Sequence, residues 1–96
     1  MLSQNIINII RLEKPFLKEH FGVLEIAVFG SRARGEAKKE SDLDILVDLE
    51  KPSFSSLMGL YSYLESKLDL KVDILRKGPH ISERFIKSIS KDLIYV

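Results

Sequence analysis

The amino-acid sequence predicts an α/β (α+β) fold in which a small mixed sheet of three to four strands is flanked by helices. Three short apolar segments are spaced along the chain, and a glycine or proline follows each of them within a few residues. The stretches between these segments carry apolar residues at helical spacing. With 96 residues and no linker or low-complexity stretch, residues 1–96 fit a single domain.

The predicted strands cover residues 25–29, 43–47 and 70–75. The first two are almost entirely apolar, as expected of buried strands, except that Asp44 interrupts the second. The final segment, 93–96, is apolar enough to form either a short fourth strand or a docked tail.

Helices are predicted between the strands from apolar spacing and capping residues. They cover residues 6–21, 31–34, 54–68 and 81–89. In the first of them, Pro15 is expected to mark a break or a first turn, because proline cannot donate a helical hydrogen bond. The short second helix is expected to end at Gly35, and Ser53 is expected to cap the third.

Composition narrows the classes of function. The absence of cysteine excludes disulfides and thiolate metal sites, and only two histidines are present. The balance of 15 basic and 14 acidic residues argues against direct nucleic-acid binding, since that usually needs a concentrated basic face. No apolar run approaches the ~20 residues that span a bilayer, and the first residues do not resemble a signal peptide. We therefore expect a cytoplasmic protein with no membrane contact.

The segment after the first predicted strand has the features of a phosphate-binding turn. Gly30 allows close backbone approach to a ligand, and Ser31 adds a hydroxyl where a short helix begins. The first amides of a helix are unpaired donors that favour anions. Among the nearby basic residues Arg34 is the candidate phosphate ligand, whereas the others are more often a solvated face. The plain alternative is a strand-to-helix turn with a serine cap.

Two carboxylates, Asp42 and Asp44, lie at the start of the second predicted strand. Residues i and i+2 of a strand share a face with Cα atoms about 7 Å apart, so both can approach one hard cation. Mg²⁺ is favoured, because it prefers a few carboxylates together with phosphate oxygens. The alternative is a pair of solvated charges at a loop edge, but an ionised Asp44 among apolar residues is costly unless it is paired or metal-bound.

Asp73 repeats this pattern in the third predicted strand. If that strand pairs beside the second, Asp73 joins Asp42 and Asp44 as a third carboxylate. It would then hold a metal ion or accept the proton of an attacking hydroxyl. The alternative is an outward-facing residue on an edge strand.

Glycine-serine, ten residues and then Asp-x-Asp resembles the signature of the DNA polymerase β-like nucleotidyltransferase superfamily. The fuller text, GSRARGEAKKESDLDILVDLE, is similar to the MNT group of minimal nucleotidyltransferases of bacteria and archaea. The motif covers residues 30–44, and the order of elements agrees with the family from about residue 14 to 89. Asp73 is matched by element order only.

The resemblance implies a nucleotidyltransferase fold and Mg²⁺-dependent attack of an acceptor hydroxyl on the α-phosphorus of ATP, with pyrophosphate leaving. It implies catalytic, metal-binding roles for Asp42, Asp44 and Asp73, and nucleotide contacts at Gly30 and Ser31. It also implies a partner: a HEPN-type ribonuclease toxin, which this chain would bind in a hetero-oligomer and adenylylate on tyrosine as its antitoxin.

Two other functions stay open at this point. The chain could be a non-catalytic module that neutralises its partner by contact alone, or a nucleotidyltransferase that acts on a small molecule or an RNA end. Carboxylates in apolar strands weigh against a pure binder, because binding alone would not require them.

Overall fold

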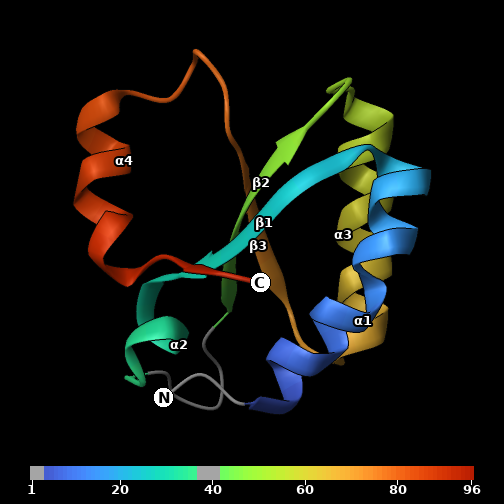
Figure 1. The fold of residues 1–96 in the computed structure, drawn as a ribbon, viewed down its shortest axis with the longest axis horizontal. Helices are drawn as coiled ribbons and strands as arrows, with labels where there is room; N and C mark the ends of the chain where they lie inside the picture. Colours follow the sequence, from blue (N-terminus) through green and yellow to red (C-terminus); the bar gives the residue numbers. More distant parts are fainter. Residues whose placement is uncertain (1–3, 37–41) are drawn as a thin grey trace.

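The computed structural model describes residues 4–36 and 42–96 (Figure 1). Its elements, in chain order, are α1 (Gln4–Phe21), β1 (Val23–Phe29), α2 (Gly30–Arg34), β2 (Leu43–Leu49), α3 (Phe54–Leu68), β3 (Val72–Arg76), α4 (Glu83–Ile89), the 3-10 helix η1 (Ser90–Asp92) and β4 (Ile94–Tyr95). None of the helices described is both long and apolar enough to cross a bilayer.

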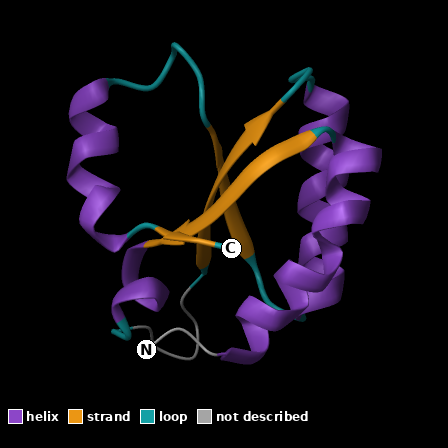
Figure 2. Ribbon diagram, in the orientation of Figure 1, coloured by secondary structure: helices purple, strands orange, loops and turns teal. Residues whose placement is uncertain are grey.

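One four-stranded sheet organises the molecule, with the strand order β3-β2-β1-β4. β1 is antiparallel to β2 and to β4, whereas β2 and β3 are parallel. The predicted mixed sheet flanked by helices is therefore confirmed (Figure 2). The last segment forms a short edge strand, and Val96 extends its pairing by donating a backbone hydrogen bond to the Ile26 carbonyl at 3.0 Å.

The two faces of the sheet differ in what covers them. α1 and α3 lie together on one side, to the right of the sheet in Figure 1, and they cover the face that carries Leu43 and Ile45. The largest fully buried side chains are Ile10, Leu17, Ile26, Val28, Leu43, Ile45, Val47, Leu60 and Leu64. Because side chains alternate along a strand, Asp44 and Leu46 belong to the opposite face, which we call the second face.

The expected interruption at Pro15 is wrong, because α1 runs through this position without a break. Pro15 cannot donate to the carbonyl of Arg11, but both residues are exposed, so water can satisfy that carbonyl. Ile10 and Leu17, one on each side of this point, are fully buried. Their burial holds both halves of the helix on the sheet and offsets the lost hydrogen bond.

α3 protects the outer edge of β3, which no other described strand pairs. Glu65 accepts a hydrogen bond from the Val72 amide at 3.0 Å. The Tyr61 hydroxyl accepts from the Ile74 amide at 3.0 Å and donates to the Ile74 carbonyl at 3.2 Å. These two side chains replace a neighbouring strand, so the edge offers fewer free backbone groups to another chain.

Ser53 begins α3 as expected, since its hydroxyl accepts a hydrogen bond from the Ser56 amide at 3.0 Å. The end of α3 is at Asp69, which adopts a left-handed conformation with φ 52° and donates its amide to the Glu65 carbonyl. Both ends of α3 are therefore fixed, which sets the position of Tyr61 and Glu65 against β3.

Replacing Tyr61 by phenylalanine should lower the free energy of unfolding by about 1–2 kcal/mol, because the amide and carbonyl of Ile74 both lose their partner. Denaturant unfolding of the variant measures the change. Ser62→Ala on the exposed side of the same helix is the control and should stay within about 0.5 kcal/mol of the parent. Equal stability of Tyr61→Phe and the parent would contradict the edge-protecting role.

Candidate active site

The centre of the candidate site is a pair of aspartates on neighbouring strands. In the parallel ladder of β2 and β3, Asp44 lies directly opposite Asp73. Residues opposite each other in a ladder point to the same side, and neighbouring strands are about 4.8 Å apart. The two carboxylates therefore share the second face, with Asp44 half-buried and Asp73 exposed.

Asp42 lies two residues before Asp44 and is exposed, just ahead of β2. Its negative charge acts on Asp44 and helps raise the pKa of that carboxyl group. Residues 37–41, which include two lysines of the motif and Ser41, lie outside the described residues. The structure thus places all three predicted aspartates at one end of the sheet, where β2 and β3 begin and β1 ends.

The pKa of Asp44 is raised above its usual value of 3.8. Burial is the largest cause, repulsion from Asp73 and then Asp42 adds to it, and attraction by Arg34 acts in the opposite direction. The second face therefore holds more negative charge near Asp44 than its surroundings compensate. A bound cation would relieve this repulsion.

Divalent metal fits this donor set in part. Carboxylate oxygens are the ligands that Mg²⁺ prefers, and Asp44 and Asp73 present them side by side. Within the part of the chain that the structure describes, however, no group of three or more acidic or histidine side chains is gathered closely enough to hold an ion alone. Mg²⁺ is usually held by one or two carboxylates together with phosphates and water, so an incomplete protein cage is compatible with it.

Gly30 connects β1 to α2 and passes very close to Asp44. Its φ of +78° favours glycine, and a Cβ added here would overlap the Asp44 carboxylate oxygen and lie 3.0 Å from the Asp44 Cγ. The close backbone approach predicted for this glycine is therefore present. In the structure the near neighbour is the Asp44 side chain itself, which links the glycine-serine turn directly to the acidic pair.

Ser31 follows in the first turn of α2 and is half-buried. Its hydroxyl forms no hydrogen bond with any part of the chain that the structure describes, and no side chain caps the start of α2. α2 ends as predicted at Gly35, which has a φ of 78°. The Ser31 hydroxyl is therefore free to contact a ligand beside Asp44.

Arg34 lies at the other end of α2 and pairs with two carboxylates. It contacts Asp92 of η1 at 3.1 Å and Glu36 at 3.3 Å, and these hydrogen bonds raise its pKa. It thereby joins α2 to the segment that leads into β4. The Arg34 side chain is still 40% exposed, but a phosphate contact would compete with both carboxylates, so its nucleotide-binding role stays a prediction.

Next to the acidic pair, the second face carries a row of residues that sequence reasoning missed. Tyr95 of β4 pairs with Ala27, which in turn pairs with Leu46. This row lies two residues along the strands from the row formed by Phe29, Asp44 and Asp73, so both rows are on the same face. Alternation along residues 93–96 could have assigned Tyr95 to one face, but only the pairing of β4 with β1 shows that it is the acidic face.

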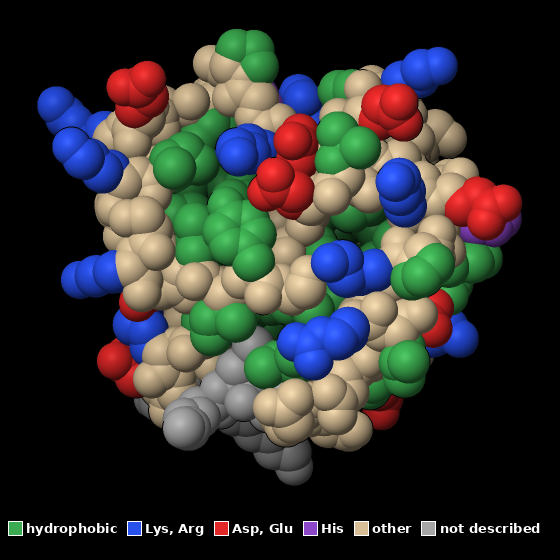
Figure 3. Space-filling view, viewed as in Figure 1, with side chains coloured by type: hydrophobic (Ala, Val, Ile, Leu, Met, Phe, Trp, Pro, Cys, Tyr) green, Lys and Arg blue, Asp and Glu red, His purple; other side chains and the backbone are tan. Residues whose placement is uncertain are grey.

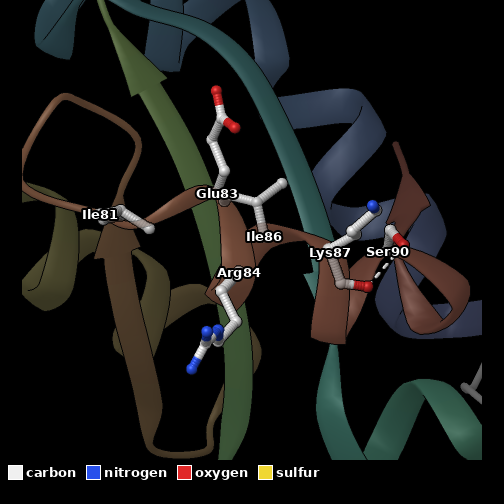
Figure 4. Close-up of a pocket in the computed structure, with 6 residues that line it drawn as sticks. All are labelled: Ile81, Glu83, Arg84, Ile86, Lys87 and Ser90. Carbon is white, nitrogen blue, oxygen red and sulfur yellow. Dashed lines mark hydrogen bonds between the residues drawn. The ribbon is translucent and has the colours of Figure 1, made fainter.

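α4 lies across the sheet from α1 and α3, to the left in Figure 1. A hollow of about 620 Å³ runs along it, and Figure 3 shows hydrophobic side chains exposed in the hollowed left half of this view. The lining residues are Ile81, Glu83, Arg84, Ile86, Lys87 and Ser90, drawn in Figure 4, where the Ser90 hydroxyl donates to the Lys87 carbonyl at 2.8 Å. The hollow is amphipathic, with two isoleucines among charged residues.

Gly30→Ala should destabilise the protein by about 2–4 kcal/mol, because the new methyl group adds steric overlap with Asp44 to the cost of a positive φ. Gly22→Ala is the matched control, since Gly22 has a φ of +69° but its added Cβ would meet only ordinary contacts at 3.7 Å and beyond. The control should lose about 1–2 kcal/mol in denaturant unfolding. Equal losses in the two variants would contradict the close approach.

Asp44→Asn should stabilise the metal-free protein at neutral pH. The folded pKa is higher than the unfolded pKa, so ionisation costs folding stability as the pH rises from the unfolded value through the folded one. The variant should therefore unfold at a higher temperature than the parent at pH 7 in EDTA. The difference should vanish at about pH 3, where the Asp44 carboxyl group is protonated in both the folded and the unfolded state. When Asp73 is also replaced by asparagine, Asp44→Asn should raise the unfolding temperature by a smaller amount. An equal rise with and without Asp73 would argue against repulsion between the two carboxylates.

Comparison with known proteins identifies the family. The model of the nucleotidyltransferase domain matches residues 10–96. The protein adenylyltransferase MntA of Thermococcus cleftensis is 44% identical over 94 residues, which cover 97% of this chain and 94% of the relative. A candidate protein adenylyltransferase of Methanocaldococcus jannaschii, MJ1379, is 47% identical over 91 residues, covering 92% and 91% of the two chains.

Solved structures agree with this assignment. The structure of a candidate minimal nucleotidyltransferase superposes with a TM-score of 0.72 at 30% identity, covering 94% of this chain and 87% of the other. An MNT antitoxin in complex with a tri-AMPylated HEPN toxin, from Shewanella oneidensis, shares the fold with a TM-score of 0.58 at 22% identity, covering 95% of this chain and 65% of that one. The chain therefore belongs to the nucleotidyltransferase family and has the fold of its minimal members.

Proposed function

We propose that this nucleotidyltransferase transfers AMP from ATP to a tyrosine hydroxyl of a HEPN-type toxin and thereby acts as the antitoxin of that partner. The observation that carries the proposal is the placement of Asp44 opposite Asp73, with the Gly30 backbone against the Asp44 carboxylate. In this proposal residues 1–96 act as a single minimal domain in the cytoplasm, where ATP and Mg²⁺ are available.

Asp42, Asp44 and Asp73 would hold the divalent metal, for which Mg²⁺ fits the oxygen-only donor set. When bound, the ion would neutralise phosphate charge and lower the pKa of an acceptor hydroxyl. The raised pKa of Asp44 supports this assignment, because its carboxylate is crowded by negative charge that a cation would compensate.

Gly30 and Ser31 would contact the triphosphate. The Gly30 backbone lies against Asp44, so phosphate oxygens held at this turn would be close to the carboxylates. The Ser31 hydroxyl is available for a hydrogen bond, as described above. Arg34 would add a contact only by leaving Asp92 or Glu36, so we expect its contribution to be smaller than that of Ser31.

Asp73 has the position that an acceptor can reach from solvent. It is exposed and lies on β3, an edge strand of the sheet, whereas Asp44 is half-buried on the neighbouring strand. An acceptor hydroxyl that approaches past Asp73 would find a carboxylate able either to hold an ion or to accept its proton. β3 and β1 flank β2 on opposite sides, so a hydroxyl beside Asp73 would approach from the side away from the glycine-serine turn. In-line displacement needs this approach if the turn holds the leaving pyrophosphate.

The choice of acceptor rests on the relatives. MntA of Thermococcus cleftensis is named as a protein adenylyltransferase, and the Shewanella oneidensis MNT antitoxin was solved with its AMPylated HEPN toxin. By this likeness we propose a hetero-oligomer with a HEPN-type partner. A non-catalytic binding module, or transfer to a small molecule or RNA end, remains as an outcome of the test below.

Incubation with labelled ATP, Mg²⁺ and the protein encoded by the adjoining open reading frame should label that partner. Asp42→Asn and Asp44→Asn should each lower the rate about a thousandfold, which corresponds to about 4 kcal/mol of transition-state stabilisation. Asp48→Asn is the matched control, because Asp48 lies farther along β2 on the same face and pairs with Glu25. Its labelling rate should stay within about twofold of the parent.

The other outcomes separate the alternatives. If the Asp42/Asp44 double variant still forms the complex and neutralises the partner fully, contact alone is sufficient and the enzymatic proposal is wrong. If the partner stays unlabelled while a small molecule or RNA end accepts AMP, the activity is retained and the acceptor is wrong.

A further inference from the structure

Arg34 is held by two carboxylates that differ in their exposure to water. Its Nη1 atom donates to Asp92 Oδ2 at 3.1 Å, and its Nε atom donates to Glu36 Oε2 at 3.3 Å. The Asp92 side chain is 14% exposed, whereas the Glu36 side chain is 66% exposed. Because water screens an exposed ion pair and competes for its hydrogen bonds, the contact with Asp92 is the stronger of the two.

The two carboxylates also differ in how the fold holds their backbone. Asp92 ends η1 and is followed closely by β4, in which Ile94 pairs with Val28 of β1. Glu36 follows the end of α2, and its amide donates to the Ser31 carbonyl at 2.9 Å. Asp92 therefore supports Arg34 from an element that is tied to the sheet, whereas Glu36 belongs to the same turn of chain as Arg34 itself.

The geometry of the guanidinium group gives the two contacts different consequences. Its Nε and Nη2 atoms form one edge, whose two N–H groups match two oxygens of a phosphate. Asp92 binds Nη1 and so leaves this edge open. Glu36 binds Nε alone, and Nη2 forms no hydrogen bond with the residues that the structure describes. Loss of the Glu36 contact would therefore free the whole edge while Asp92 still holds the group.

Arg34 lies on the side of the site where the triphosphate would continue. It follows Ser31 by three residues in α2, so the two side chains lie on the same side of this short helix. Burial is the largest cause of the raised pKa of Asp44, and the positive charge of Arg34 acts in the opposite direction. The guanidinium group is therefore close enough to the acidic pair to affect it, on the side of the glycine-serine turn.

We propose that Asp92 is a positioning residue that holds Arg34 through Nη1, so that the Nε–Nη2 edge binds the β- and γ-phosphates of ATP. Glu36 occupies this edge in the absence of nucleotide and is displaced when the phosphates bind. The inference rests on the proposed function, because it uses the same triphosphate site. It adds to nucleotide binding a supporting carboxylate from the far end of the chain and a carboxylate that competes with the phosphates.

The two carboxylates should consequently have opposite effects on ATP binding. Removal of either negative charge reduces the repulsion of ATP, so general electrostatics predicts tighter binding for both Asp92→Asn and Glu36→Gln. Without Asp92, however, the phosphates themselves must order the Arg34 side chain, and we expect Asp92→Asn to weaken ATP binding about fivefold. Glu36→Gln removes an exposed competitor and should strengthen ATP binding about twofold.

The test is a titration of the full chain with ATP and Mg²⁺, together with the KM for ATP and the kcat of transfer to the partner. Asp92→Asn should raise the Kd and KM for ATP while kcat stays within about twofold of the parent. Asp92→Glu keeps the carboxylate and should bind ATP more tightly than Asp92→Asn. Arg34→Lys keeps the charge but lacks the two-pronged edge, so it should weaken binding. Glu19→Gln, on the exposed side of α1, is the charge control and should leave the Kd unchanged.

The opposite effects should both depend on Arg34. When Arg34 is also replaced by alanine, Asp92→Asn should no longer weaken ATP binding and Glu36→Gln should no longer strengthen it. A purely structural role of Asp92 would instead weaken binding equally with and without Arg34. Glu36→Gln keeps the test decisive even if Asp92→Asn folds poorly, because Glu36 is an exposed residue whose replacement should not disturb folding.

Binding and transfer, measured side by side, separate this inference from the proposed function. ATP binding by Asp92→Asn that equals or exceeds that of the parent, or weaker binding by Glu36→Gln, overturns the inference, and labelling of the partner by the parent then leaves the proposed function intact. The expected pattern of ATP binding without transfer to the partner supports the role of Asp92 and counts against the proposed acceptor.

Discussion

The parallel register of β2 with β3 is the constraint on which the site depends. It brings Asp44 and Asp73, which are far apart in the sequence, to neighbouring positions on one face. A slip of one residue would turn one of them into the core. The register is held by the apolar residues on the opposite face, since Leu43 and Ile45 are fully buried under α1 and α3. Packing on one side of the sheet thus fixes the position of the acidic pair on the other.

Local signals in the sequence were sufficient for most elements and for part of the site. Glycine and proline bounded the strands, Ser53 marked a helix start, and an aspartate inside an apolar strand pointed to a function. Pro15 was misread because the burial of the helix residues around it, which offsets a lost hydrogen bond, depends on tertiary contacts. Tyr95 was missed because strand order is a property of the whole sheet, and the last two-residue strand gave no sign that it pairs with β1.

In the candidate site, folding stability and the proposed function make opposing demands. Asp44 is placed where burial and two other carboxylates oppose its ionisation, which works against the folded state at neutral pH. Gly30 adds a backbone conformation that other residues adopt at a cost. Both features bring backbone amides, a hydroxyl and carboxylates together in a small volume. This is the arrangement that a highly charged ligand and its counter-ion can stabilise when they bind.

The protection of β3 by Tyr61 and Glu65 has a consequence for self-association. Sheets of different molecules can join only where backbone donors and acceptors are unpaired. The β3 border is occupied by side chains of the same molecule, and the opposite border is the two-residue strand β4. Stacking of copies into a continuous ribbon would need both borders, so this architecture disfavours fibre growth even at high protein concentration.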